Sequence, residues 1–378
     1  MTGQITQPTV KGWCPHAYRP MESGDGLILR LRPLLGRLTR PQMLAVCEVA
    51  DAAGNGILDL TSRGNLQVRG LDVPSHQEAV IALLGADVIM SDPFVEQRRA
   101  LLIDPFWRAG DLSVRLATQL VNALRDFPKL PGKAGFAIDT GTQPCLQSAS
   151  ADIRFELSET GALVIRADGV AGGLAVAETD AIAAAIEVAG WYAARVSGGR
   201  GRLRDLIKNE NYPCAWQSEA VRRQSELPSY PGSTPIGQQV AVPFGQIAAK
   251  TLRTLAETSS GIRLTPWRTL VLEGIEDFRH PELIHTSDHP LLRADACPGA
   301  PRCASAFIDT RRIARLLAPL TRGSLHVSGC AKGCARQARA DLTIVGTQDG
   351  FDIVRGGTAQ TPPDQTRFAE CDLLAGTF

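Results

Sequence analysis

Four cysteines near the end of the chain are the strongest candidates for a metal or redox site. They form two pairs, Cys297-x5-Cys303 and Cys330-x3-Cys334. Proline and glycine around the first pair predict a loop that can wrap around a bound group, and Gly333 gives the backbone room within the second pair. Four thiolates from two loops suit either a zinc ion or an iron–sulfur cluster. Structural zinc sites favour shorter gaps, so the pattern predicts a 4Fe-4S cluster and a redox enzyme, with zinc and unrelated buried thiols as alternatives.

The other cysteines carry weaker signals. Cys14 lies beside His16 in an N-terminal loop, where it could ligate iron or pack against the protein. Cys47 falls on the apolar face of a predicted helix, and Cys371 falls in a Thr/Pro/Gln-rich tail. The chain has nine cysteines, and the polar segment 1–10 does not resemble a secretory leader. We therefore expect a cytoplasmic protein whose reduced thiols bind metal or lie buried.

Composition narrows the class of protein. The chain has 378 residues, a formal net charge of +1 and 44% apolar residues. This length predicts two or three domains, and the apolar content argues against disorder over most of the chain. The near-zero net charge argues against a general nucleic-acid binder, and no uncharged apolar run is long enough to span a bilayer. We therefore expect no nucleic acid and no membrane among its partners.

An internal repeat predicts a duplicated half-domain. The copies span 26–71 and 240–275, each with a strand, a glycine, a helix and a second strand region. Within them, 61–71 matches 265–275 at an offset of 204 positions. Thr39 as N-cap and Pro41 in the first turn predict the start of the first helix, and residues 246–257 should form its counterpart. A duplication implies pseudo-twofold symmetry around a shared cleft; the alternative is chance similarity between two ordinary βαβ units.

Strand alternation predicts a cationic face on the first copy. Arg30 and Arg32 share one side of the first strand, with leucines on the other side. Four polar residues of the second strand region share a side in the same way: Arg63, Asn65, Gln67 and Arg69. Because the planar guanidinium binds both oxygens of a carboxylate, this face suits recognition of a carboxylate-bearing ligand. The alternative is an ordinary solvated sheet face.

The organisation expected from these patterns has five segments. They are a first half-domain with an N-terminal loop (1–75), a central α/β domain (76–228), a second half-domain (229–280), a cluster-binding domain (281–357) and a loose C-terminal tail (358–378). Within the central domain, Asp180 to Arg195 should be helical, and 152–157 and 162–167 should be neighbouring strands.

Several motifs resemble the sulfite and nitrite reductase superfamily. They are the cysteine pattern together with Thr61–Gln67, Arg99–Pro105 and Leu130–Gly135. The resemblance implies an α+β fold with duplicated ferredoxin-like half-domains, and it implies that Arg63, Arg99 and Lys133 face an anion or a tetrapyrrole. In that superfamily the last cysteine, here Cys334, also bridges the cluster to sirohaem iron. The chain departs from the pattern at Ala100 and Gly135, where the reductases have asparagine and a second lysine.

One branch of the superfamily resembles the chain more closely. The stretches Gly12–Gly26 and Leu325–Ala335 are similar to the precorrin-3B synthase family. In that family the tetrapyrrole is the substrate, and the enzyme is a monooxygenase that hydroxylates precorrin-3A at C20 with formation of a γ-lactone in aerobic cobalamin synthesis. The resemblance implies a 4Fe-4S cluster, a mononuclear non-haem iron, O2, and electrons from NADH through a reductase or ferredoxin.

The residues expected to serve this function fall into three groups. The substrate-binding candidates are Arg30, Arg32, Arg63, Gln67, Arg69, Arg99, Lys133 and Arg268. The cluster ligands are the four paired cysteines, and the possible ligands of the mononuclear iron are His16 and His326, either of which could instead be structural. The alternatives are a sirohaem-dependent assimilatory sulfite or nitrite reductase and a non-catalytic electron-transfer or zinc-stabilised binding protein.

Overall fold

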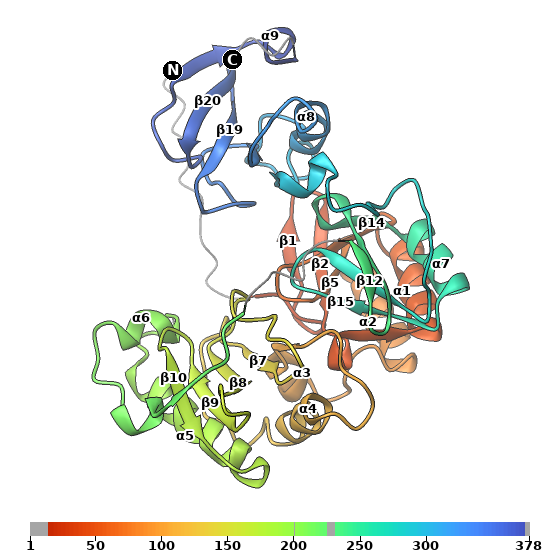
Figure 1. Ribbon diagram of the computed structural model, residues 1–378. Helices are drawn as coiled ribbons and strands as arrows, with labels where there is room; N and C mark the ends of the chain where they lie inside the picture. Colours follow the sequence, from red (N-terminus) through yellow and green to blue (C-terminus); the bar gives the residue numbers. More distant parts are fainter. Residues whose placement is uncertain (1–13, 200, 225–230, 375–378) are drawn as a thin grey trace.

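The computed structural model describes residues 14–199, 201–224 and 231–374 and contains four sheets with helices against them. Gly12 and Trp13 of the N-terminal motif, and the expected domain boundary at residue 228, lie outside the described residues. Figure 1 shows three parts: paired half-domains, a central domain and a C-terminal domain. The mixture of helices and sheets confirms the α+β prediction.

Each half-domain sheet borrows a strand from the other copy. The first sheet has the order β1 (Met21–Ser23), β2 (Gly26–Leu31), β5 (Leu66–Leu71), β4 (Ile57–Leu60) and β14 (Gln246–Ala248). The second has the order β12 (Gly232–Thr234), β13 (Gly237–Ala241), β16 (Thr269–Glu273), β15 (Gly261–Leu264) and β3 (Arg37–Thr39). Thus β14 pairs with β4, and β3 pairs with β15, which ties the two copies together.

The repeat extends to unusual backbone angles. Leu35 and Phe244, each directly before a glycine, have φ values of 54° and 56° in equivalent 3-10 turns, η1 (Leu34–Gly36) and η4 (Pro243–Gly245). Gly64 and Arg268, 204 positions apart, have φ values of 60° and 59°. A non-glycine residue rarely adopts this left-handed conformation, so its repetition at matched positions supports a true duplication.

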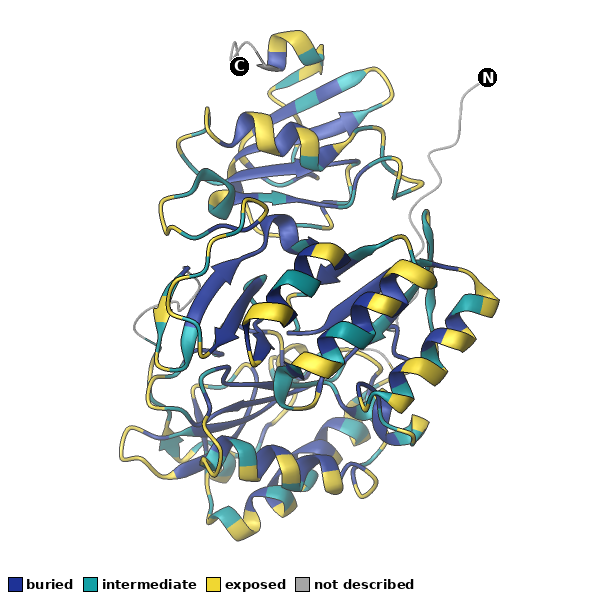
Figure 2. Cartoon of the chain, turned by 90° about the vertical axis from the view of Figure 1, so that its right-hand side faces the viewer, coloured by how far each residue is buried: buried dark blue, intermediate teal, exposed yellow. Residues whose placement is uncertain are grey.

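The two copies share one core. Helix α1 (Arg40–Ala52) begins at the predicted cap, where Thr39 and Gln42 form a capping box. Its counterpart α7 (Ala249–Thr258) begins three residues later than expected, because 246–248 form the exchanged strand β14. The Cys47 thiol donates to the Ala249 carbonyl at 3.3 Å between these helices, within a core that spans both copies and is flanked by α2 (Val73–Gly85). Figure 2 shows exposed residues on the outward sides of these helices.

The central domain is a six-stranded mixed sheet with helices. Its strand order is β11 (Glu219–Ala220), β10 (Gly172–Ala175), β9 (Leu163–Ala167), β8 (Ile153–Leu157), β7 (Phe136–Asp139) and β6 (Leu101–Ile103). Its helices are α3 (Pro93–Arg98), α4 (Leu112–Asn122), α5 (Ala181–Arg195) and α6 (Leu203–Ile207), with 3-10 turns η2 (Glu178–Asp180) and η3 (Cys214–Gln217). The predicted α5 helix and the β8–β9 pairing are both present.

The C-terminal domain is a five-stranded sheet covered by one helix. The order is β17 (Ala294–Ala296), β18 (Leu325–Ser328), β19 (Ala340–Thr347), β20 (Gly350–Gly357) and β21 (Gln365–Phe368), with α8 (Thr310–Leu317), α9 (Glu370–Leu374) and the turn η5 (Pro290–Arg293). The prediction of a loose tail after 358 was wrong, because β21 pairs with β20 and Leu373 is fully buried in the core. No helix among the described residues is long and apolar enough to cross a membrane.

Candidate functional site

One face of the first sheet is polar across four strands. Gln246, Asp59, Gln67 and Arg30 are Cα partners in β14, β4, β5 and β2. The Gln67 amide oxygen, in the orientation that satisfies both groups, accepts from Arg30 Nε and Nη2 at 3.1 and 2.7 Å. With Asn65 and Arg69, which alternation puts on the same side, these residues form what we call the polar face.

A small cavity, the arginine pocket, lies where the polar face meets the central domain. Arg30, Arg32 and Arg63 line it from the half-domain, and Ala100 and Gly135 line it from the central domain. Its volume of about 10 Å³ has room for about one water molecule. Burial lowers the pKa of the Arg30 and Arg63 guanidinium groups, which nevertheless stay cationic near neutral pH. The pocket therefore concentrates positive charge that suits one anionic group of a larger ligand.

Three other predicted arginines bind internal carboxylates, and the fourth candidate, Lys133, has an exposed side chain. Arg69 is 3% exposed and binds Asp25 at 2.7 Å and Asp59 at 3.1 Å. Arg99 is 4% exposed and binds Glu96 at 2.6 Å. The guanidinium of Arg268 binds Asp295 at 2.9 Å, while Lys133 is exposed and its carbonyl accepts from Arg63 at 3.0 Å. A substrate carboxylate would have to compete for these three arginines, and their role in binding stays a prediction.

The N-terminal loop lies near the arginines that line the arginine pocket. Cys14 makes a side-chain hydrogen bond with Arg30 and lies within electrostatic reach of Arg32 and Arg63. His16 is 9% exposed, and its Nδ1 has no hydrogen-bond partner among the described residues. Burial, followed by the charges of Arg32 and Arg19, lowers the His16 pKa to about 4. His16 is therefore a neutral imidazole at pH 7 beside a cationic pocket.

The four paired cysteines come together at the ends of two parallel strands. Cys297 follows β17 and Cys330 follows β18, and parallel pairing of β17 with β18 brings both loops to one edge. The Gly329 amide donates to Cys297 Sγ at 3.3 Å. Burial and then the charges of Cys297 and Cys330 raise the pKa of the Cys334 thiol, with a smaller contribution from Cys303. The other three thiols thus lie within electrostatic reach of Cys334.

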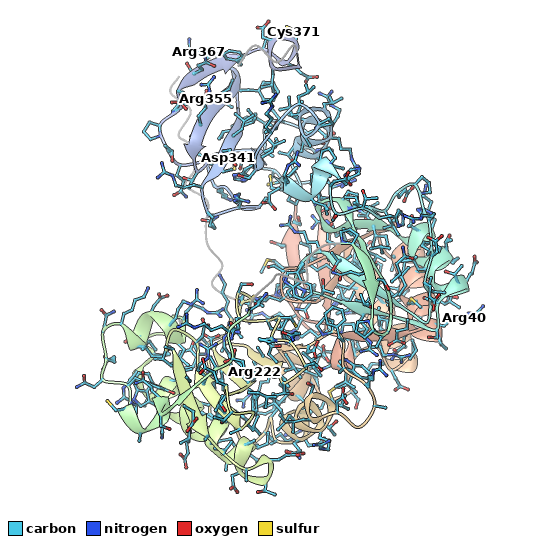
Figure 3. All side chains as sticks on the ribbon, in the orientation of Figure 1. Arg40, Arg222, Asp341, Arg355, Arg367 and Cys371 are labelled. Atoms are coloured by element: carbon cyan, nitrogen blue, oxygen red, sulfur yellow. The ribbon has the colours of Figure 1, made fainter. Side chains whose placement is uncertain are left out.

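This donor set fits a cluster held by four thiolates. Amide donors such as Gly329 stabilise thiolate sulfur, and a left-handed Gly333 (φ 62°) lets the backbone turn between Cys330 and Cys334. Across the described ranges, no three His, Cys, Asp or Glu side chains are arranged to ligate a single metal ion. Cys371 lies at the far end of the domain in α9 (Figure 3).

The two candidate iron ligands lie in different parts of the chain. His16 belongs to the N-terminal loop, whereas His326 lies on β18 of the C-terminal sheet. His326 is fully buried, with neither ring nitrogen hydrogen-bonded among the described residues, and burial lowers its pKa. Among the described residues, no cluster of metal-ligating side chains brings the two imidazoles together, so a shared iron site stays a prediction.

Two arginines of the C-terminal domain reach the polar face and were missed by the sequence analysis. Arg302 donates to the Gln246 amide oxygen at 2.7 Å, and Arg311, at the start of α8, lies 3.6 Å from Asp59. The Arg311 side chain is 12% exposed, and its Nε and Nη1 lack partners among the described residues. Arg302 lies within the Cys297-x5-Cys303 pattern and Arg311 lies outside every motif above, but neither position indicates a contact with the first sheet. Only the folded arrangement could reveal that the cysteine loops sit on the polar face.

Comparison with known proteins places these features in context. The family model of the nitrite/sulfite reductase ferredoxin-like half domain matches residues 19–86. The chain is 32% identical to precorrin-3B synthase of Sinorhizobium sp. over 93% of this chain and 84% of that protein. It is 24% identical to the chloroplastic ferredoxin–nitrite reductase of Spinacia oleracea over 42% of this chain and 33% of that protein.

A solved structure shows the same fold. The Mycobacterium tuberculosis NirA protein aligns with a TM-score of 0.66 and 20% identity, covering 88% of this chain and 74% of that one. This likeness confirms the sulfite/nitrite-reductase-like fold predicted from the cysteine pattern and the repeat. With the match along nearly the whole sequence, it follows that the chain belongs to the precorrin-3B synthase family, within the sulfite and nitrite reductase superfamily.

Proposed function

We propose that this protein is a precorrin-3B synthase that acts in aerobic cobalamin biosynthesis. In this reaction an O2-dependent monooxygenase hydroxylates precorrin-3A at C20, and a ring-A acetate closes a γ-lactone. One oxygen atom enters the substrate and the other leaves as water, with two electrons drawn ultimately from NADH. The relative of that name, 32% identical over 93% of this chain, supports the proposal most strongly.

The polar face suits a flat substrate rimmed with carboxylates. Arg30 and Arg63 would together bind one carboxylate at the arginine pocket, and Gln67 would hold the Arg30 fork in a fixed orientation. Two buried nitrogens of Arg311 have no hydrogen-bond partner among the described residues. A second substrate carboxylate, bound away from the arginine pocket, would accept from them. Exposed ion pairs contribute at most about 1 kcal/mol each, so tight binding requires several of them in one enclosed site.

The cysteine loops would hold the electron-transfer group beside this face. Cys297, Cys303, Cys330 and Cys334 would ligate a 4Fe-4S cluster, and the Gly329 amide would stabilise the Cys297 thiolate. When bound, the cluster and a mononuclear iron would supply single electrons and activate O2. The contacts of Arg302 with Gln246 and of Arg311 with Asp59 join the cluster-binding domain to the polar face, so the two sites form one unit.

A sirohaem-dependent sulfite or nitrite reductase is the second candidate. The half-domain match and the NirA-like fold favour it, because both are features of that superfamily. Against it, Gly135 lines the arginine pocket where the reductases carry a second lysine. Any Cβ at position 135 would lie 3.2 Å from the Ala100 carbonyl oxygen, which leaves little room for a larger side chain. A pocket poorer in cations suits binding of a substrate carboxylate better than proton-coupled reduction of a small anion.

Anaerobic purification followed by iron, sulfide and pigment assays tests the proposal. We expect about four iron and four sulfide per chain for the cluster, with no extractable sirohaem, and conversion of precorrin-3A to a product heavier by one oxygen atom under O2. Stoichiometric sirohaem with sulfite or nitrite reduction would establish the second candidate instead. Tightly bound zinc without sulfide would indicate a binding protein that lacks redox chemistry.

A further inference from the structure

His326 on β18 is a fully buried polar side chain that the protein leaves without a hydrogen-bond partner. Neither Nδ1 nor Nε2 of its ring is paired with any of the described residues. A buried polar group without a partner costs about 1–3 kcal/mol, so folded proteins keep few of them, commonly where a water, an ion or a redox group is the partner. Burial lowers the pKa of His326, so its ring is neutral at pH 7 and carries one N–H to donate.

The neighbours of His326 across the sheet are already paired with other groups. Asp295 of β17 and Thr343 of β19 are its Cα partners, so the three side chains lie on one face of the sheet. The two carboxylate oxygens of Asp295 accept from two arginines at 2.9 and 3.0 Å. The Thr343 hydroxyl donates to the Gly357 carbonyl at 3.0 Å. Neither neighbour therefore pairs with the His326 ring.

Strand alternation directs His326 away from the core of the C-terminal domain. Its neighbours in β18, Leu325 and Val327, are buried in that core with Ile313 and Leu317 of α8. Because side chains alternate along a strand, His326 points to the opposite face of the sheet. The unpaired ring thus lies on the face that α8 does not cover.

The turn between Cys330 and Cys334 lies against the polar edge of this ring. Gly333 has no side chain, and a Cβ at that position would lie 3.6 Å from Cε1 of His326. Cε1 is the ring carbon bonded to both nitrogens, so the edge that carries the N–H is the edge nearest the turn. Gly333 directly precedes Cys334. The unpaired donor therefore lies beside the backbone that carries a proposed cluster ligand.

We propose that His326 donates its ring N–H to a sulfur of the cluster held by Cys330 and Cys334, and that this bond favours the reduced cluster. The inference rests on the 4Fe-4S cluster of the proposed function. Reduction adds negative charge that spreads onto sulfur, so a donor stabilises the reduced form more than the oxidised form and raises the potential. The Gly329 amide acts in the same way on Cys297, at 3.3 Å. His326 then tunes the electron-transfer group and ligates no iron.

Redox titration of the anaerobically purified protein, followed by EPR of the reduced cluster, tests this role. His326→Leu removes the donor but keeps a side chain of similar volume. We expect reduction of the cluster to become about tenfold less favourable, which is a fall of about 59 mV in midpoint potential. His326→Gln keeps an N–H donor and should recover at least half of that fall. The matched control is Thr343→Val, which removes a fully buried hydroxyl on the same face of the sheet and should leave the potential unchanged.

A second measurement decides the question even if His326→Leu fails to fold. In wild-type protein labelled with 15N-histidine, pulsed EPR of the reduced cluster should show a weak nitrogen coupling through the hydrogen bond. This coupling should disappear in His326→Gln, whose amide nitrogen is not labelled. Absence of the coupling from the wild-type protein would overturn the inference.

Three results of the redox titration would also overturn it. They are an unchanged potential in His326→Leu, equal potentials in His326→Leu and His326→Gln, or an equal fall in Thr343→Val. Loss of iron from His326→Leu at constant sulfide and constant potential would make this residue an iron ligand instead.

Failure of the proposed function gives a different result. The potential difference between wild type and His326→Leu would persist in a protein that holds the cluster but does not convert precorrin-3A, and the inference would stand alone. An unchanged potential in a protein that does convert precorrin-3A would overturn the inference alone. Zinc in place of the cluster would overturn both.

Discussion

The strands β4 and β5 of the first half-domain and their counterparts β15 and β16 carry the same ion pair with its charges exchanged. Asp59 and Arg69 are 3.1 Å apart in the first sheet. The matched residues, 204 positions later, are Arg263 and Glu273, which are 2.7 Å apart in the second. The backbone arrangement has thus been kept while the electrostatic character of the two faces has diverged.

The surroundings explain this divergence. In the second sheet, Glu273 also accepts from Arg37 of β3, and Arg263 donates to the Pro105 carbonyl at 2.9 Å and lies 3.8 Å from the Trp107 ring. Trp267, which matches Arg63, packs against a small apolar cluster of the central domain. The second face is therefore neutralised and holds the domains together, whereas the first keeps Arg30 and Arg63 at a cavity and meets the cysteine loops. One copy of a duplicated surface thus holds domains together, and the other is the face on which we propose that the substrate binds.

Loss of the proposed cluster should have the largest effect on the difference between the two half-domain faces. Cys330→Ser deletes one of the four proposed thiolate ligands, so we expect the loss of nearly all iron and sulfide and of all oxygenase activity. Binding of a carboxylated porphyrin, which stands in for the tetrapyrrole substrate, should be retained at the polar face. Iron, sulfide and absorption assays measure the effect. The matched control is Cys371→Ser, because Cys371 is exposed in α9 away from the cysteine loops (Figure 3). A full cluster in Cys330→Ser would contradict the ligand assignment.

Arg263→Ala should cost stability without affecting binding. The Arg263 side chain is 7% exposed, and its loss would leave Glu273 with Arg37 alone and remove the contacts to the central domain. Breaking a buried pair costs about 3 kcal/mol, which urea unfolding would detect as a lower midpoint. The control Arg279→Ala removes an exposed pair of the same half-domain and should change stability by less than about 0.5 kcal/mol. Weaker porphyrin binding by folded Arg263→Ala would show that the second face also contacts the ligand.

Sequence alone predicted what is local or repeated. The offset of 204 positions and the α1 cap at Thr39 follow from spacing and side-chain chemistry. The expected alternation places Gln67 and Arg69 on one side of β5, but it does not reach Arg63, which lies in the turn between β4 and β5. The exchange of β3 and β14 was not predictable, because three-residue strands carry little pattern and their partners are chosen by tertiary pairing.

The site was less predictable than the fold for a related reason. Whether an arginine is available to a ligand depends on which carboxylate of the protein binds it. Arg69, for example, donates to Asp25 of the β1–β2 turn, which lies 44 positions earlier in the sequence. Residues 335–339 form a loop from which Arg336 binds Asp295 at 3.0 Å, a carboxylate that also binds Arg268. Arg311 reaches Asp59 only because the C-terminal domain packs on the first sheet.

Arg63→Ala tests the first half-domain, whose polar face keeps its arginines at a cavity. Arg63 lines the arginine pocket and donates to the Lys133 carbonyl, but it forms no ion pair with another described residue, so its loss should cost little stability. We expect porphyrin affinity to fall about tenfold while iron and sulfide stay at wild-type levels. The control Arg40→Ala changes an exposed arginine at the start of α1, on the outer side of the half-domains (Figure 3). Loss of the cluster in Arg63→Ala would mean that this residue supports the cysteine loops.

The smallest expected effect concerns His16, which lies in the N-terminal loop near the arginine pocket. Its pKa is about 4 in the folded protein and about 6.5 when unfolded, so between these values the unfolded chain binds a proton that the folded chain does not. Folding stability should therefore fall as the pH decreases from 6.5 to 4, by at most about 1.4 kcal/mol per pH unit from this group. His16→Gln removes this titration and leaves the carboxylates unchanged. The stability difference between wild type and His16→Gln, measured by urea unfolding at pH 7.5, 6 and 5, should shift progressively in favour of the variant as the pH falls. A constant difference across this range would show that His16 is protonated in the folded protein or solvated in its loop, and that burial and the charges of Arg32 and Arg19 do not lower its pKa.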